Sequence, residues 1–262
     1  MTDALQCSVN DAVMQLSLNR SHCHNAFDDA LLQDLHDAVL HANEDASVRV
    51  IQLQAEGKHF CAGADLAWMK KMAEYSEEEN YQDSLLLAKT MNAFYTSTKP
   101  TLAVVHGSAY GGGAGLVAAC DIAIAEEDAQ FCFSEAKLGL IPAVISPYVV
   151  EAIGARASKH LFMTAERFNA HKALQLGLIH HCVHLSELSL FAKGICQQLL
   201  HCAPEAVAQS KALVNHVQHK AIDADLQRYT ARKIAEKRVS EEGQKGLQAF
   251  LQKQPIDWNK ES

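Results

Sequence analysis

The stretch "SAYGGGAGLVAACD", residues 108–121, places three consecutive glycines directly before an apolar run that ends in an aspartate. Glycine loses more conformational freedom on ordering than any other residue, so a triplet at the start of a buried helix requires a reason. We consider a nucleotide-binding loop, a tight strand-to-helix turn with close packing, and a helix N-terminus whose N–H groups stabilise a negative oxygen. The first is excluded, because neither G-x-G-x-x-G nor a following Lys-Ser or Lys-Thr pair is present.

Two further segments favour the third explanation. Upstream, "KHFCAGADLAWM" (58–69) contains another turn of small residues that leads into a helix. Downstream, in "FCFSEAKLGLIP" (131–142), Glu135 is flanked by two phenylalanines and a leucine. The chain thus offers two turns with N–H groups and one acid among apolar neighbours, and we expect these neighbours to raise the pKa of Glu135 toward neutrality.

Composition and charge exclude several classes of partner. The 262 residues are 48% hydrophobic and 21% charged, which suffices for a sizeable core. The net charge of −8 gives no basic footprint for a nucleic acid or an anionic membrane. The eight cysteines are scattered without a C-x-x-C pair, the first residues do not resemble a secretory signal, and no apolar stretch reaches membrane-spanning length. We therefore expect reduced thiols and a cytoplasmic location.

Strand-like and helix-like segments alternate through the first half of the chain. Alternation and apolar runs predict strands at 13–18, 48–54, 101–107, 122–125 and 131–133. Between them we expect a helix capped by Asp28 or Asp29, and a short helix after the glycine triplet. A helical stretch is expected from about Leu66 to Ala93, with a polar and mobile part around residues 75–79. A last short strand is expected at 178–184, and only helices from Ser186 onward. The pattern predicts an α/β fold with crossover connections and a helical C-terminal layer.

The fourteen histidines raise the question of a metal site. The densest groups are "SHCHN" (21–25) and "HHCVH" (180–184). Neither has zinc-finger spacing, and no second cluster at a matching distance accompanies them. We expect no metal site.

Three ordered motifs resemble the signature segments of the crotonase (enoyl-CoA hydratase/isomerase) superfamily. They are "FCAGADL" (60–66), "YGGGAGLxxACD" (110–121) and "FxxSExKLGLIP" (131–142). The similarity extends over essentially the whole chain. It implies a spiral of repeated ββα units over residues 1–195, which holds the acyl-CoA site, and helices over 196–262 that form a homotrimer or a dimer of trimers.

The resemblance also implies a mechanism. Members of the superfamily polarise the thioester carbonyl of an acyl-CoA with two peptide N–H groups, so that an enolate can form. On this chain the donors correspond to Ala64 and Gly112, and the acid–base group corresponds to Glu135. A thioester oxygen against Gly112 would explain the glycine, since a side chain would exclude that oxygen.

Further positions are implied for binding CoA and the acyl chain. They are Lys58, Ala62, Asp65, Leu66, Trp68, Phe250 and Lys253. Ala62, Asp65 and Leu66 would act through their backbone, and Lys58 would contact a phosphate. Trp68 either lines the acyl pocket or belongs to an ordinary buried stripe. Phe250 and Lys253 match positions that approach the CoA of a neighbouring subunit.

Segments 63–76 and 134–154 most resemble the bacterial 3-methylglutaconyl-CoA hydratases of leucine breakdown. This implies a lyase that hydrates a short-chain 2-enoyl-CoA without a separate cofactor, since CoA is part of the substrate. Hydratases of the family commonly carry a second glutamate where this chain has Gly115. Members with a single acid at the Glu135 position include enoyl-CoA isomerases, which are the alternative. Bulky residues at 143–145, where many relatives have glycines, either reshape the acyl wall or pack in the core.

Two remote alternatives are RNA binding and ligand binding without catalysis. One relative of the methylglutaconyl hydratases binds RNA through a lysine-rich helix. The corresponding segment here, residues 28–45, contains no Lys or Arg, five Asp and one Glu. Such a charge disfavours contact with phosphates, so RNA binding is a poor hypothesis.

Overall fold

The computed structural model describes residues 3–258, and a six-stranded sheet lies at its centre. The strand order is β1-β2-β3-β4-β6-β9; β1 and β2 are antiparallel, and all other neighbours are parallel. The strands are β1 (Leu5–Asn10), β2 (Val13–Leu18), β3 (Val50–Ala55), β4 (Thr101–Val105), β6 (Ile122–Glu126) and β9 (His181–Val183). Parallel neighbours need crossover connections, which is why strands and helices alternate along the chain.

A second, smaller sheet contains β5 (Ser108–Tyr110), β7 (Gln130–Cys132) and β8 (Phe168–Asn169). Strands β5 and β7 are parallel, with Tyr110 opposite Cys132. The chain therefore leaves both strands at the same edge, where Gly111 follows β5 and Glu135 comes shortly after β7. This sheet brings the glycine triplet and Glu135 together.

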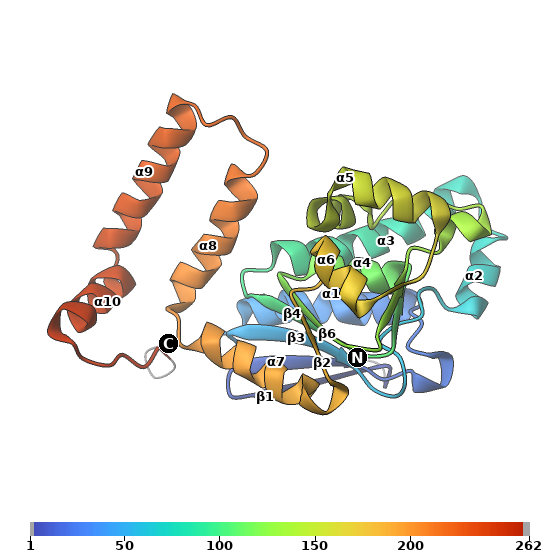
Figure 1. Cartoon of the computed structure of the whole chain (residues 1–262), viewed down its shortest axis with the longest axis horizontal. Helices are drawn as coiled ribbons and strands as arrows, with labels where there is room; N and C mark the ends of the chain where they lie inside the picture. The colour runs from blue at the N-terminus through green and yellow to red at the C-terminus, as the bar shows by residue number, and fades with distance from the viewer. Residues whose placement is uncertain (1–2, 259–262) are drawn as a thin grey trace.

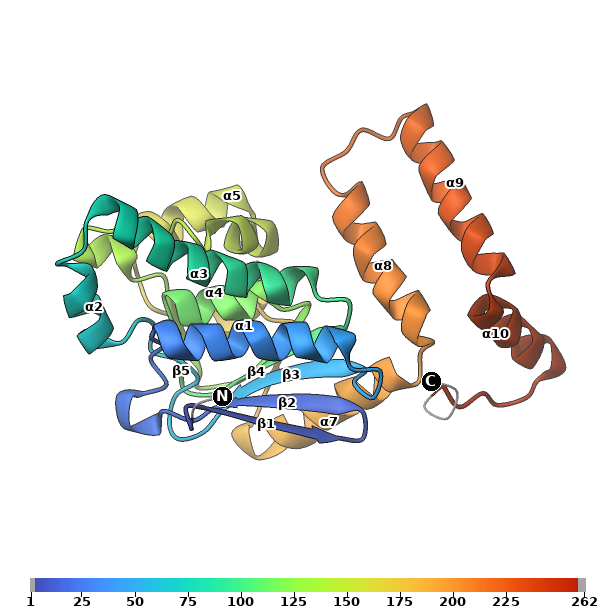
Figure 2. The ribbon, with the colours of Figure 1, turned by 180° about the vertical axis from the view of Figure 1, so that it is seen from behind.

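Helices cover both faces of the large sheet (Figures 1 and 2). The helices of this part of the chain are α1 (Asp29–Glu44), α2 (Leu66–Met72), α3 (Glu77–Thr96), α4 (Gly112–Ala119), α5 (Ser146–Thr164), α6 (Ala170–Leu176) and α7 (Leu185–Leu200), of which α2 lies beyond the end of the sheet. The main core includes side chains of α1, α3 and α4, whereas α7 packs on the opposite face. Neighbouring strand residues alternate between the two, as Ile51 and Val50 do. Within residues 3–258, no helix has both the length and the apolarity to cross a membrane.

Local capping explains where two of these helices begin. Asp28, one of the two expected caps, accepts a hydrogen bond from the amide of Leu31 at 3.0 Å and starts α1. The helical stretch expected from about Leu66 to Ala93 consists of two helices, α2 and α3, and the break between them adjoins the polar residues 75–79. Ser76 starts α3 with a capping box, in which its amide donates to a side-chain oxygen of the glutamate three residues later at 2.8 Å.

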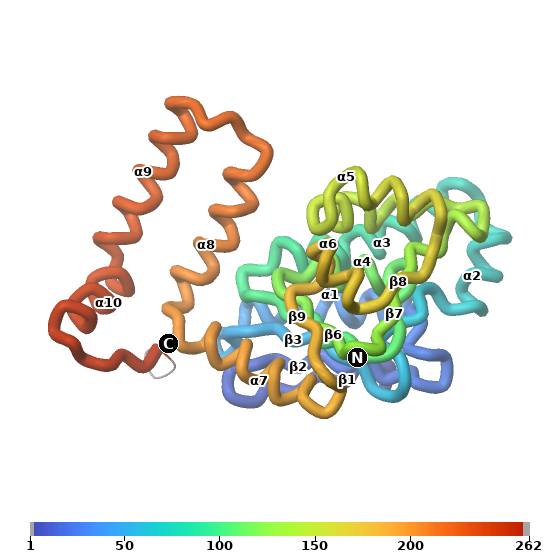
Figure 3. Tube along the Cα trace, in the orientation of Figure 1, coloured from blue at the N-terminus to red at the C-terminus, as the bar shows by residue number. Residues whose placement is uncertain are grey.

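The chain leaves the core after α7. The following helices, α8 (Pro204–Val217), α9 (Ala224–Val239) and α10 (Glu241–Gln252), extend away from both sheets (Figures 1–3) and contain no buried residue. Of the expected C-terminal layer, only α7 packs on the sheet.

The boundary expected between residues 195 and 196 falls inside α7, because Ile195, Cys196 and Leu200 complete the apolar cluster there. The outer ends of the two expected parts, residues 1–2 and 259–262, lie outside the described residues.

An ammonium group connects α8 to the core. Lys211 Nζ donates to the carbonyl of Phe94 at 3.2 Å and to Asp121 Oδ2 at 2.8 Å. We expect Lys211→Met to lower the free energy of unfolding by about 1–3 kcal/mol, because both acceptors lose a charged donor. Urea denaturation measures the loss. Lys233→Met, which removes an exposed pair with Glu236, is the control and should cost less than about 0.5 kcal/mol. Equal losses would contradict the role of Lys211.

Candidate active site

The glycine triplet forms the start of α4, next to the small sheet. Gly111 has a φ of +50°, which favours glycine, and its amide donates to the carbonyl of Cys132 at 2.8 Å. The next amide, that of Gly112, is the first in the helix and donates to no acceptor among residues 3–258. The first amides of a helix have no acceptor within it, so this N–H group is available to a ligand.

The second turn that we expected to supply an N–H group, residues 61–65, is hydrogen-bonded to β5. Cys61 N donates to Ser108 O at 3.0 Å, and Tyr110 N donates to Cys61 O at 2.9 Å. The amide of Ala64 has no acceptor in the described part of the chain either. The two turns are thus in direct contact, and each presents an unpaired amide at its expected position.

Glu135 begins a short 3₁₀ helix after β7 and lies beside Gly111. A Cβ atom added to Gly111 would be 3.3 Å from Glu135 Oε1, so the carboxyl group is adjacent to the start of α4. The other oxygen, Oε2, is buried and has no hydrogen-bond partner within residues 3–258. Burial raises the pKa of Glu135, in the expected direction, because loss of water disfavours the charged form.

The structure shows a steric reason for the glycine at position 112 that the sequence did not reveal. A Cβ atom on Gly112 would lie 2.3 Å from Cζ and 2.9 Å from Cε1 of Phe27. The phenyl ring of Phe27 thus excludes a side chain at this position, and the thioester oxygen against Gly112 stays a prediction. Gly113 faces Cys61 in the same way, since a Cβ atom on Gly113 would lie 2.7 Å from the Cys61 carbonyl oxygen. Close packing and an unpaired amide, considered above as alternatives, occur together.

Position 115, where a second glutamate would stand, is filled by a side chain from another segment. A Cβ atom on Gly115 would lie 2.2 Å from Ile145 Cγ2 and 2.8 Å from Ile145 Cβ. Ile145 is 2% exposed and belongs to the main core, so core packing accounts for its bulk. A glutamate at position 115 would have to displace Ile145. Of the two positions that carry acids in family hydratases, only 135 does so here.

The positions assigned to CoA lie mainly around the turn at 61–65. The amides of Ala62 and Asp65 already donate to backbone carbonyls at 3.0 and 2.9 Å, so they are not free for a ligand. The carbonyl of Ala62 accepts no hydrogen bond within the described chain. Leu66 and Lys58 are exposed. At Ala62, the backbone carbonyl rather than the amide is therefore available to a ligand such as CoA.

The remaining assigned positions lie elsewhere. Trp68 is buried, packs edge-on against Phe27 with ring centroids 5.8 Å apart, and donates from Nε1 to Asp83 Oδ1 at 3.0 Å. These contacts favour the buried-stripe interpretation of Trp68. Phe250 and Lys253 lie at the end of α10, on the opposite side of the molecule from α2 (Figure 1). Within one chain they are not brought to the other site residues.

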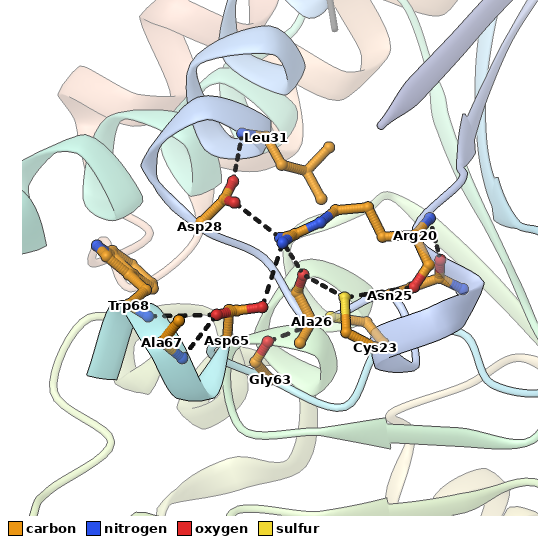
Figure 4. A network of polar contacts seen from close by, with 11 residues as sticks. Arg20, Cys23, Asn25, Ala26, Asp28, Leu31, Gly63, Asp65, Ala67 and Trp68 are labelled. Carbon is orange, nitrogen blue, oxygen red and sulfur yellow. Dashed lines mark hydrogen bonds and ion pairs between the residues drawn. The ribbon is translucent and has the colours of Figure 1, made fainter. Parts of the chain in front are cut away.

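A polar network that the sequence did not reveal surrounds the turn at 61–65 (Figure 4). Arg20 Nη2 donates to Asp65 Oδ2 at 3.1 Å, and Nη1 donates to the carbonyl of Ala26 at 2.7 Å and pairs with Asp28 Oδ2 at 3.0 Å. The other carboxylate oxygen of Asp65 caps α2. Arg20 lies within a segment that resembles the family, but no spacing rule pairs it with an aspartate 45 residues later.

The second histidine group has structural contacts. His180 Nδ1 accepts from the amide of Ala123 at 3.1 Å, and the side chain of His184 caps α7. Among residues 3–258, no group of three His, Cys, Asp or Glu side chains is arranged to hold a metal ion. All eight cysteines are free thiols, and burial raises the pKa of Cys61 to about 12.

A family model described as enoyl-CoA hydratase/isomerase matches residues 8–261. The chain belongs to this family. A Legionella pneumophila protein described as an enoyl-CoA hydratase/isomerase (crotonase) is 54% identical, with a TM-score of 0.94 over 98% of this chain and 100% of that one. An enoyl-CoA hydratase from Shewanella pealeana is 43% identical, with a TM-score of 0.94 over 97% and 96%. The short-chain-enoyl-CoA hydratase of Clostridium acetobutylicum is 30% identical over 94% of this chain and 93% of its own length.

These matches confirm the superfamily and the α/β fold expected from the three motifs. The enoyl-CoA hydratase/isomerase family consists of enzymes, and membership implies an acyl-CoA substrate. The unpaired amides and the buried carboxyl group described above therefore lie in an enzyme that acts on acyl-CoA thioesters.

Burial of Glu135 predicts a pH-dependent stability. The pKa of Glu135 is raised in the folded protein, so the folded state favours the protonated side chain. This contribution to the free energy of unfolding is fully present below the ordinary pKa of glutamic acid. It is lost as the pH rises through the pKa of the folded protein. Glu135→Gln carries no charge and should be more stable than the wild type at neutral pH and similar to it at about pH 4. Thermal denaturation across this range measures the difference, with exposed Glu74→Gln as the control. A difference that does not vary with pH would refute the interpretation.

Proposed function

We propose that the protein hydrates a short-chain 2-enoyl-CoA through an enolate held by the amides of Ala64 and Gly112. The observation that carries the proposal is the contact between two turns whose amides lack acceptors among residues 3–258, beside the buried carboxyl group of Glu135. Two N–H donors aimed at a developing oxyanion are an effective source of transition-state stabilisation. Coenzyme A is part of the substrate, and the reaction needs no further cofactor.

In the proposed reaction Glu135 carries the proton. Its carboxylate takes a proton from water as the water oxygen bonds to C3, and the C2–C3 double-bond electrons shift until the thioester oxygen carries the negative charge. The two amides hold this enolate. The carboxyl group then gives the proton to C2, the carbonyl re-forms and the carboxylate is restored, which yields a 3-hydroxyacyl-CoA. A pKa raised by burial suits this exchange, because it lies closer to neutral pH.

Among short-chain substrates we propose 3-methylglutaconyl-CoA, which would place the enzyme in leucine breakdown. The basis is the resemblance of segments 63–76 and 134–154 to the bacterial hydratases of that compound. The name of the Clostridium acetobutylicum relative supports a short acyl chain. Comparison of kcat/KM for 3-methylglutaconyl-CoA and crotonyl-CoA shows whether the enzyme prefers the branched substrate or a simple short-chain one.

Substitution of Glu135 tests the proton carrier. We expect Glu135→Gln to lower kcat for hydration by about 10²–10⁴-fold and to change the affinity for butyryl-CoA little, because the amide keeps the shape of the side chain but cannot exchange the proton. Loss of enone absorbance measures hydration, and calorimetric titration measures affinity. Wild-type protein that binds both unsaturated thioesters without hydrating either would remove the proposal and identify a binding-only protein.

An enoyl-CoA isomerase is the second candidate, favoured by Ile145 in the space beside Gly115. A single carboxylate can take a proton from C2 of a 3-enoyl-CoA and return it to C4, which moves the double bond into conjugation. The enolate and its two N–H donors are the same as in hydration, but no water has to be positioned. Appearance of enone absorbance from a 3-enoyl-CoA measures this activity.

The pair Gly115 and Ile145 offers a test of the missing second acid. We expect Gly115→Glu alone to cost about 1–3 kcal/mol of stability or more, because the new side chain overlaps Ile145. Adding Ile145→Gly should recover part of that cost and raise the ratio of hydration to isomerisation. Denaturation and the two absorbance assays measure these changes, with Ile145→Gly alone as the control. Gly115→Glu that is as stable as the wild type would contradict the steric argument.

We propose that the protein forms a homotrimer or a dimer of trimers and has neither nucleic acid nor membrane as a partner. The three extended helices, which contain no fully buried residue, expose large apolar side chains, among them Val214, Ile234, Val239, Phe250 and Leu251. A second copy that covers this surface would also allow Phe250 and Lys253 to reach a neighbouring CoA. The free thiols favour a reducing compartment, and we propose the cytoplasm.

A further inference from the structure

Phe27 contacts both of the turns that carry the unpaired amides. Its main chain pairs with the turn at 61–65: Phe27 N donates to Gly63 O at 2.9 Å, and Asp65 N donates to Phe27 O at 2.9 Å. The carbonyl of Gly63 and the N–H of Ala64 belong to one planar trans peptide and point in opposite directions. Because the carbonyl points at Phe27, the N–H of Ala64 is turned away from it.

The ring of the same residue lies against the other donor. A Cβ atom on Gly112 would be 2.3, 2.9 and 3.5 Å from Cζ, Cε1 and Cε2 of Phe27, so the far edge of the ring touches the first residue of α4. The ring is 3% exposed and packs edge-on against Trp68. The ring therefore has little space in which to move and limits how closely α4 can approach.

Arg20 contacts the two residues that flank Phe27 in the sequence, Ala26 and Asp28 (Figure 4). Its guanidinium group bonds the carbonyl of Ala26 and the carboxylate of Asp28, the residues before and after Phe27, and also Asp65, the residue after Ala64. Charge-assisted hydrogen bonds of this kind have defined geometry as well as strength. A slip of Phe27 along the turn would break several of them together.

We propose that Phe27 is a positioning residue for the two amides: its main chain orients the N–H of Ala64, and its ring sets the place of Gly112. This inference rests on the proposed function, in which both amides bind one oxygen. A displacement of about 1 Å at a reacting group can cost on the order of 10²-fold in rate. Phe27 then affects catalysis without touching the substrate.

Phe27→Leu tests the inference, since it removes the ring atoms nearest Gly112. We expect kcat to fall by about 10- to 100-fold while KM changes by less than about threefold, because the donors are displaced but the rest of the binding site remains. Phe94→Leu is the control. The Phe94 side chain is also buried. Phe94 lies toward the other end of α4, because Lys211 bonds both the Phe94 carbonyl and Asp121, which follows that end. An equal loss of kcat in both variants would overturn the inference. Phe27→Met, which keeps more of the volume, replaces Phe27→Leu if that variant does not fold.

A double-mutant cycle tests the contact itself. Gly112→Ala should lower the Tm of the wild type more than that of Phe27→Leu, because the added methyl group overlaps the ring only in the wild type. The same decrease in both backgrounds would show that the ring does not define the position of Gly112 and would overturn the inference.

The infrared band of the thioester carbonyl measures polarisation without turnover. Butyryl-CoA bound to the wild type and to Phe94→Leu should show its carbonyl band at lower wavenumber than in solution, and the shift should be smaller in Phe27→Leu. An equal shift in all three proteins would overturn the inference and leave the proposed function intact. Failure of the wild type to bind butyryl-CoA or to shift its band would overturn the proposed function, and this inference with it.

Discussion

The candidate site depends on the backbone pairing of Cys61 with Ser108 and Tyr110. Two hydrogen bonds, of 3.0 and 2.9 Å, hold a turn from the first part of the chain against the strand that leads into α4. Backbone groups make these bonds, so they require side chains that are small enough rather than particular functional groups. This constraint explains why both turns consist largely of glycine and alanine, and why Gly113 stands directly against Cys61.

The same constraint determines what surrounds the turns. Once the backbones approach so closely, the space beside each glycine is filled by one large side chain from elsewhere: Phe27 at Gly112 and Ile145 at Gly115. Glu135 enters from the third direction, along β7, and is left with a buried oxygen that has no partner within residues 3–258. An unpaired buried acceptor is costly in a folded protein, which is why such a group is a candidate for chemistry rather than for stability.

Local signals in the sequence predicted much of the fold. Alternation located β2 and β3, an apolar run located β4, and Asp28 and the glycine triplet marked the starts of α1 and α4. The motifs placed Ala64, Gly112 and Glu135 in one site, and the structure brings their turns together. The partners of the glycines could not be predicted, because periodicity shows which face of a segment is apolar but not which distant residue packs on it. For the same reason the sequence predicted the C-terminal helices but not that α8–α10 leave the core.

The thiol of Cys61 has a further consequence. Its sulfur would be 3.0 Å from a Cβ atom on Gly113, so it lies between the two turns. A conjugated thioester is an electrophile that ionised thiols attack at C3. Burial raises the pKa of the Cys61 thiol to about 12, so the thiol is protonated at neutral pH. Desolvation thus keeps the Cys61 thiol protonated beside the start of α4, which limits its reaction with an electrophilic thioester.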